Sequence, residues 1–307
     1  MSSTPVIAAP GRTFGVAACL LAATLWGTTG TAATFAPDVP ALAIGAAAMG
    51  VGGLLQAIIA VGRIRESFPT LARSWPLLMM GAVCVAIYPL AFYASMRLAG
   101  VTIGTVISIG SAPAISALIE NRIDGSRLTQ RWVIGAAIGI AGMVLLGVAE
   151  DEHVGVAPDL PLGIGLGLLA GATYALYSWS ARRIMQRGVQ SVAAMGATFG
   201  LGGIFLMPVL LLTGGPFLDS SANLAVGAYM AIVPMFLGYV AFGIALARIP
   251  SSQATTISLF EPVVATILAV IIVGERLPPL GWLGVGLVIA CLLCTEFPVP
   301  RRWRRAG

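Results

Sequence analysis

The sequence predicts an all-α integral membrane protein with ten transmembrane helices, arranged as two inverted repeats of five helices. Of the 307 residues, 58% are hydrophobic and 9% are charged, and the mean hydropathy is +0.96, which is far too apolar for a soluble domain. A helix needs about 20 apolar residues to cross roughly 30 Å of hydrocarbon. The apolar runs are continuous, whereas a transmembrane barrel would show alternating segments. The expected spans are 14–35, 41–61, 75–97, 101–119, 132–149, 161–181, 191–213, 223–246, 252–273 and 280–297.

The last five apolar segments repeat the first five. Pro113 and Pro262 are 149 residues apart, and each is followed twelve residues later by Gly-x-Arg-Leu. Such a cluster in the same order seldom arises by chance. Because each repeat has an odd number of spans, the second must lie upside down relative to the first, and inverted repeats are typical of alternating-access transporters. We therefore expect one membrane domain, made of an N-terminal repeat (1–152) and a C-terminal repeat (153–307), and transport as its function.

The arginines predict the orientation. The chain has no lysine, and 15 of its 17 basic residues share one side if the N-terminus is cytoplasmic, with only Arg97 and Arg276 outside. The positive-inside rule then places both termini in the cytoplasm of a multi-pass protein of the inner (plasma) membrane. The formal net charge of +5 thus reflects the arginines of the cytoplasmic side and does not indicate a nucleic-acid partner. We expect the lipid bilayer and a small-molecule substrate as partners, and a monomer as the working unit.

Catalytic and metal-binding motifs are missing from the sequence. The four cysteines fall inside spans, His153 is the single histidine and falls in an outer loop, and neither H-E-x-x-H nor G-x-S-x-G occurs. Cys291 and Cys294 are spaced as a C-x-x-C pair but have no nearby histidine or aspartate. We therefore expect no enzyme activity, no metal, no cofactor and no disulfide.

Glycines recur every fourth residue in several spans. Gly163, Gly167 and Gly171 form one such stripe, and Gly135 with Gly139 forms another. Lipid supplies little hydrophobic drive for helix association, so stripes of small residues let membrane helices pack closely. The stripes predict tight helix contacts.

Glu261 is the most informative single position. It lies about ten residues into the ninth span, which puts it near the bilayer midplane by helix rise, and no other ionisable acid or base falls so deep. An unpaired carboxylate is costly there, so it should face the bundle interior or water, where burial favours its protonated form. Two interpretations stay open: Glu261 binds substrate or carries a proton, or it is a protonated or hydrogen-bonded group that holds the fold.

Two prolines mark the matched spans four and nine. Pro113 leaves the carbonyl of Ile109 without its donor, and Pro262 does the same for Ser258. Interrupted helices at matched positions of two inverted halves point to a transporter's binding site. We predict that the two prolines are helix breaks used in gating, and that Ser108 and Ser258 bind substrate. The alternative is a pair of proline-kinked packing helices.

Five aromatic residues fall inside spans, where a tyrosine hydroxyl needs a partner or water. We predict that they line a central cavity, although ordinary core packing is the competing interpretation for each. An aromatic cavity with almost no charge favours an amphipathic small molecule over a phosphate. These residues are Trp26, Tyr88, Tyr174, Tyr177 and Tyr239.

Three motifs resemble the EamA family of the drug/metabolite transporter superfamily. They are Leu25-Trp26-Gly27, Leu259-Phe260-Glu261-Pro262 and Val273-Gly274-Glu275-Arg276-Leu277, and the resemblance covers nearly the whole chain. In the first repeat, Ala112 and Ser126 replace the two glutamates, so only the second repeat keeps the full signature. The resemblance implies a central cavity formed mainly by spans 1, 3, 4, 6, 8 and 9, and the export of amino acids, other metabolites or drugs.

Within this family, the aromatic residues of spans 1, 3, 6 and 8 and the lack of buried basic residues resemble the YddG-like exporters of aromatic and other neutral amino acids. The leading hypothesis is therefore a secondary transporter that exports such amino acids by alternating access, with the substrate ammonium near Glu261. The alternative is a broad-specificity exporter of drugs and lipophilic cations. The resemblance gives Glu275 a structural role at the outer end of span nine.

Overall fold

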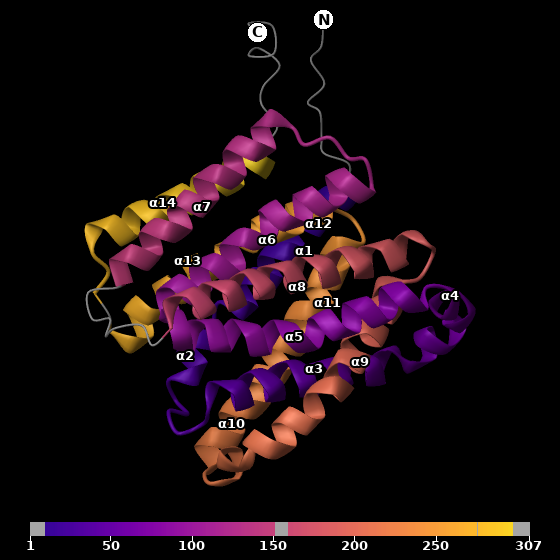
Figure 1. Cartoon of the computed structure of the whole chain (residues 1–307), viewed down its shortest axis with the longest axis horizontal. Helices are drawn as coiled ribbons and strands as arrows, with labels where there is room; N and C mark the ends of the chain where they lie inside the picture. The colour runs from indigo at the N-terminus through magenta and orange to yellow at the C-terminus, as the bar shows by residue number, and fades with distance from the viewer. Residues whose placement is uncertain (1–9, 151–158, 275, 297–307) are drawn as a thin grey trace, which may run out of the picture.

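The computed structural model describes residues 10–150, 159–274 and 276–296, and every regular element within them is helical (Figure 1). The first half contains α1 (Pro10–Trp26), α2 (Thr29–Ala33), α3 (Ala41–Glu66), α4 (Phe68–Arg73), α5 (Trp75–Ala99), α6 (Val101–Ile123) and α7 (Gln130–Glu150). The second half contains α8 (Leu160–Gln186), α9 (Ser191–Thr213), η1 (Gly215–Leu218), α10 (Ser221–Met230), η2 (Ala231–Leu237), α11 (Gly238–Leu246), α12 (Ser251–Ile257), α13 (Phe260–Leu268), η3 (Ala269–Val273) and α14 (Pro279–Glu296). The expected repeat boundary at 152 and 153, together with His153, Glu275 and the four arginines of the C-terminal tail, lies outside the described residues.

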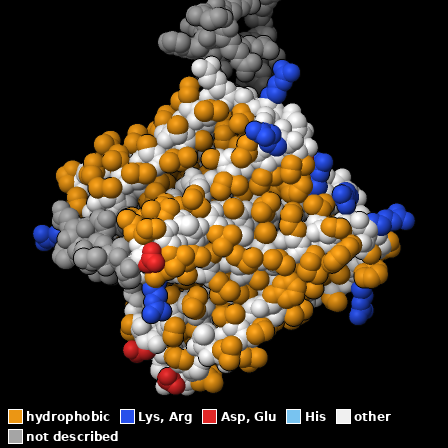
Figure 2. All heavy atoms as spheres, in the orientation of Figure 1, with side chains coloured by type: hydrophobic (Ala, Val, Ile, Leu, Met, Phe, Trp, Pro, Cys, Tyr) orange, Lys and Arg blue, Asp and Glu red, His pale blue; other side chains and the backbone are white. Residues whose placement is uncertain are grey.

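Nine helical segments among the described residues are long and apolar enough to cross a membrane. The expected tenth span is a shorter apolar helix, Pro279–Thr295. Leu211, Leu212 and Ile271 are 84%, 87% and 74% exposed, and apolar side chains cover most of the face in Figure 2. A soluble surface rarely exposes so much apolar area. The prediction of an all-α membrane protein is confirmed.

Three spans are interrupted. Span one consists of α1 and α2, span eight of α10, η2 and α11, and span nine of α12, α13 and η3. The segments η2 and η3 are π-helical, and η2 contains Pro234. Single π-helical turns within α-helices occur frequently at functional sites.

Both ends of the described chain lie at one end of the bundle, which we call the terminal end. Arg12 of α1 and Thr295 of α14 line the same hollow there, together with the connections that follow α6 and α11. The second half starts at the opposite end, where the backbone N–H of Asp159 donates to the carbonyl of Leu98, near the end of α5. The first helices of the two halves, α1 and α8, therefore start at opposite ends of the bundle.

The glycine stripes lie at the helix contacts, as predicted. A Cβ on Gly163 would lie 2.6 Å from the Cβ of Ala99, and one on Gly171 would lie 2.8 Å from the carbonyl oxygen of Ser108. These contacts bring α8 against α5 and α6. Without side chains at these positions the backbones can touch, which gains the packing that drives helix association in lipid.

The pair α7 and α14 stands to one side of the other helices (Figure 1). These two helices cross at Gly142 and Gly284, where a Cβ on either glycine would lie 2.8 or 2.7 Å from the carbonyl oxygen of the other. The remaining helices surround an aromatic core in which Tyr177, Phe199 and Phe242 are each less than 2% exposed. This core forms the support for the site.

Replacing Gly163 by alanine should destabilise the bundle by about 1–3 kcal/mol, the range for an overpacked core. The added methyl would meet the backbone nitrogen of Ala99 at 2.6 Å, and a backbone atom cannot move aside cheaply. Gly165→Ala is the matched control, because it lies on the same helix with nothing within 4 Å of an added Cβ. Thermal unfolding in detergent measures both variants, and an equal melting temperature would contradict the prediction.

Candidate functional site

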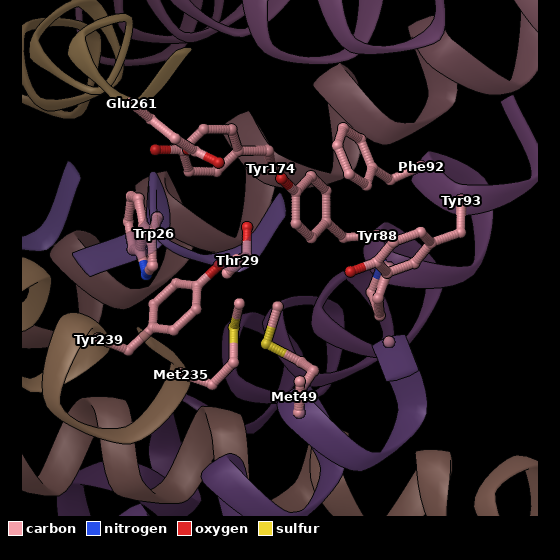
Figure 3. A pocket seen from close by; sticks show the side chains of 13 residues that line it. Trp26, Thr29, Met49, Tyr88, Phe92, Tyr93, Tyr174, Met235, Tyr239 and Glu261 are labelled. Atoms are coloured by element: carbon pink, nitrogen blue, oxygen red, sulfur yellow. The ribbon is translucent and has the colours of Figure 1, made fainter. Parts of the chain in front are cut away.

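A pocket walled by aromatic side chains lies where helices of the two halves meet (Figure 3). Elements α1, α2, α3 and α5 of the first half line it, together with α8, η2, α11 and α13 of the second. Its volume is about 40 Å³, which holds only a few water molecules. We call it the aromatic pocket, and its lining residues are Trp26, Thr29, Gly45, Ala48, Met49, Tyr88, Pro89, Phe92, Tyr93, Tyr174, Met235, Tyr239 and Glu261.

Trp26 reaches the pocket because α1 ends there. A Cβ on the next residue, Gly27, would lie 2.8 Å from the carbonyl oxygen of Glu261 and 2.6 Å from the Cβ of Val264. Only glycine lets the end of α1 approach α13 so closely. The Trp-Gly sequence therefore brings an indole ring and Glu261 into one wall.

Glu261 lies in the first turn of α13, directly after the break in span nine. Pro262 has no N–H to offer the carbonyl of Ser258, and this carbonyl instead accepts the backbone N–H of Glu261 at 2.9 Å. The Glu261 side chain is half-buried and lines the pocket. Among the described residues, no arginine lies within ion-pair distance of its carboxylate.

Hydrogen-bonded tyrosines form the pocket wall that faces the terminal end. The hydroxyl of Tyr174 donates to Ser258 Oγ at 2.9 Å, and the hydroxyls of Tyr177 and Tyr239 lie 2.9 Å apart. The rings of Trp26 and Tyr239 lie 4.7 Å apart between centroids. Each buried hydroxyl in this wall thus has a partner, which holds the rings in one arrangement.

The eight residues predicted to bind substrate fall into three groups. Five of them line the aromatic pocket: Trp26, Tyr88, Tyr174, Tyr239 and Glu261. Tyr177 and Ser258 lie behind it and hydrogen-bond to two of the lining tyrosines. Ser108 lies outside it, fully buried where α6 packs against Gly171 of α8.

The two prolines differ in their surroundings. Span nine is interrupted between Ile257 and Phe260, directly before Pro262, whereas α6 runs through Pro113 without a break. A helix can absorb one missing hydrogen bond by bending. The matched positions therefore have different backbone structures.

The sequence did not predict the contribution of span two. Gly45, Ala48 and Met49 of α3 line the pocket, and a Cβ on Gly45 would lie 2.6 Å from the ring of Tyr93. In a sequence, small residues of this kind look the same whether they pack helices or leave room for a ring. Tyr93 itself carried a usable signal, because it is a tyrosine inside span three, where a hydroxyl needs a partner or water.

A second hollow, of about 400 Å³, extends from the pocket toward the opposite end. It is lined by residues of spans one, three, four, five and nine, and we call it the vestibule. By contrast, the hollow at the terminal end has no lining residue in common with the aromatic pocket. The residues common to the vestibule and the pocket are Trp26, Thr29, Phe92, Tyr93 and Glu261.

The pocket offers aromatic faces, two methionines, hydroxyls and one carboxylate. Aromatic faces and a carboxylate attract an ammonium group, and Met49 and Met235 can adapt to an apolar side chain. No lysine, arginine or histidine is among the described lining residues. The site is thus equipped for a cation or a zwitterion with an apolar part.

The chain is similar in sequence to several known transporters. The chain is 32% identical over 288 residues to the transporter YwfM of Bacillus subtilis, covering 94% of this chain and 95% of that one. It is 27% identical over 299 residues to a "Probable terminal-alkyne amino-acid exporter" of Streptantibioticus cattleyicolor, covering 94% and 98%. The threonine/homoserine exporter RhtA of Escherichia coli is 30% identical over 168 residues, or 55% of this chain and 54% of that one.

A solved crystal structure has the same fold, with a TM-score of 0.77 over 93% of this chain and 97% of its own, at 19% identity. One family description matches each half separately, over residues 13–148 and 161–296, as expected for two repeats. These matches cover most of the sequence and include both halves of the pocket. The chain therefore belongs to the EamA-like transporter family, and it is a multi-pass membrane transporter of small molecules.

Proposed function

We propose that the protein exports neutral amino acids by alternating access through the aromatic pocket. The observation that carries this proposal is the pairing of one carboxylate, Glu261, with a wall of aromatic rings where the two repeats meet. The names of two relatives, a "Probable terminal-alkyne amino-acid exporter" and a threonine/homoserine exporter, support the same substrate class. A single chain contains the whole pocket, so a monomer suffices.

In this proposal the two repeats are inverted and the terminal end faces the cytoplasm of a bacterial plasma membrane. The start of α1 and α8 at opposite ends of the bundle supports the inversion. Outside the C-terminal tail, 13 of the 17 arginines remain, and only Arg97 and Arg276 fall at the vestibule end. This distribution follows the positive-inside rule. Export then runs from the terminal end to the vestibule.

The substrate's three parts have separate partners in the pocket. The ammonium group lies against Glu261 and the face of Trp26, and the apolar side chain packs against Met49. The carboxylate accepts hydrogen bonds from hydroxyls such as those of Thr29 and Tyr88, because no basic side chain is among the described lining residues. The pocket is too small to hold an amino acid as it stands, so binding widens it toward the vestibule.

The same observation favours a second candidate, an exporter of lipophilic cations. A cation needs Glu261 and the aromatic faces but no partner for a carboxylate, and the described lining residues include no basic side chain that would be one. Competition between the two kinds of ligand distinguishes them.

Proteoliposomes loaded with unlabelled amino acid should accumulate labelled threonine, methionine or phenylalanine from outside, with saturable kinetics. Excess unlabelled amino acid should suppress this exchange, and tetraphenylphosphonium should not. Running the assay with and without a pH gradient separates proton-coupled transport from uniport. Folded protein that shows no amino-acid exchange but takes up the cation would overturn the proposal in favour of the second candidate.

Glu261→Gln should weaken amino-acid binding by about tenfold or more, because a hydrogen bond to a charged group contributes about 1.5–3 kcal/mol. Where wild-type exchange responds to a pH gradient, the variant should lose that response while saturable exchange persists. Glu66→Gln is the control, since Glu66 is an exposed carboxylate paired with Arg63 at the terminal end. Unchanged affinity and pH response in Glu261→Gln would leave Glu261 with a structural role only.

A further inference from the structure

A buried carboxylate lies at the terminal end of the bundle, outside the residues that line the aromatic pocket. Glu120, in the last turn of α6, is 6% exposed. Its Oε1 accepts the backbone N–H of Ser251 at 2.7 Å and the hydroxyl of Ser251 at 2.8 Å. Its Oε2 accepts the backbone N–H and the hydroxyl of Ser252. Four donors from the start of span nine thus hold one side chain of span four.

An arginine hydrogen-bonds to the connection between spans eight and nine, just before the serines that Glu120 binds. Arg182 of α8 donates to the carbonyls of Leu246 and Ile249, which end α11 and the turn after it. The segment 247–250 between spans eight and nine is therefore held by a carboxylate from the first repeat and by a guanidinium from the second. Charged hydrogen bonds of this kind are stronger than neutral ones.

These contacts lie on the path between the terminal end and the aromatic pocket. Tyr174, Ser178 and Arg182 are spaced four residues apart and share one face of α8. Tyr174 holds Ser258 at the pocket, Arg182 holds the connection at the terminal end, and Ser178 between them is fully buried. The hollow at the terminal end, about 650 Å³, reaches Glu120 and Arg182 but includes neither Ser178 nor any residue of the pocket.

At the opposite end, the described residues at the two matched positions carry no charged side chain. The repeat offset of 149 residues pairs Glu120 with Ala269 and Arg182 with Ala33, and both alanines line the open vestibule. A methyl group neither donates nor accepts a hydrogen bond. The two halves therefore differ at the positions where the terminal end is held shut.

We propose that Glu120 and Arg182 form a latch that must open before the pocket can reach the terminal side, and that this latch makes the vestibule-open state the resting state. The latch rests on the alternating access of the proposed function, but not on the identity of the substrate. Its opening exposes the seam between α6, α8 and α12, and the absence of a counterpart at Ala33 and Ala269 leaves the vestibule free to open when no substrate is bound.

Cysteine labelling in nanodiscs, where both ends are accessible to a membrane-impermeant maleimide, tests the latch. Ser178→Cys reports on the closed seam and Ala33→Cys on the vestibule, each in a Cys294→Ser background because Cys294 is the exposed native thiol among the described residues. Glu120→Gln should speed labelling at 178 by about tenfold, as expected for the loss of charged hydrogen bonds, and should slow labelling at 33. An amide faces the Ser252 donors with its own N–H groups, so it cannot replace the carboxylate.

Opposite changes at the two reporters distinguish a shift between states from general loosening of the fold. Glu66→Gln, which removes an exposed carboxylate at the same end, should change neither rate. If Glu120→Gln does not fold, Ser251→Ala with Ser252→Ala removes two of the four donors and should shift both rates in the same directions by about threefold. Faster labelling at both reporters, or no change at either, would overturn the latch.

The same experiment separates the latch from the substrate proposal, because labelling needs no substrate. Opposite changes in a protein that does not exchange amino acids would support the latch and refute the amino-acid assignment. Amino-acid exchange by a protein whose labelling is insensitive to Glu120→Gln would refute the latch alone.

Discussion

The burial of one carboxylate in the middle of an apolar bundle is the constraint on which the site depends. Lipid offers Glu261 no partner, so its side chain must face a cavity. The neighbouring residues form that cavity. The break before Pro262 places it in the first turn of α13, and Gly27 lets Trp26 approach it. Tyrosines that hydrogen-bond among themselves and to Ser258 complete the walls.

Close helix packing supplies the rigid frame for this cavity. Where Gly163, Gly171 and Gly142 meet neighbouring helices, the backbones come into contact, which is the main source of helix association in lipid. The irregular elements, the interruptions of spans one, eight and nine, contribute lining residues such as Met235 and Glu261. The molecule thus combines well-packed continuous helices with a few interrupted ones, and the interrupted ones meet at the site.

Duplication produced two similar halves, but their ends have diverged. The first repeat keeps Pro113 within a continuous helix, whereas the second repeat breaks before Pro262 and carries the membrane-buried glutamate. Conversely, the first repeat supplies Glu120 at the terminal end, and its partner position in the second repeat is Ala269. A symmetric pair of repeats would favour both open states of the proposed alternating access equally, and in our proposal these differences remove that balance.

The sequence by itself determined the membrane class, the repeat, the family and five of the pocket residues, because apolar length, periodic spacing and a deep charge are properties of the chain in one dimension. Only the tertiary structure decided which faces meet. It brought Gly45 and Met49 of span two into the pocket and left Ser108 against α8. It also joined Glu120 to Ser251 and Ser252, which are 131 and 132 residues away in the sequence but within hydrogen-bond distance in space. At a helix end, such a carboxylate otherwise looks like any interfacial charge.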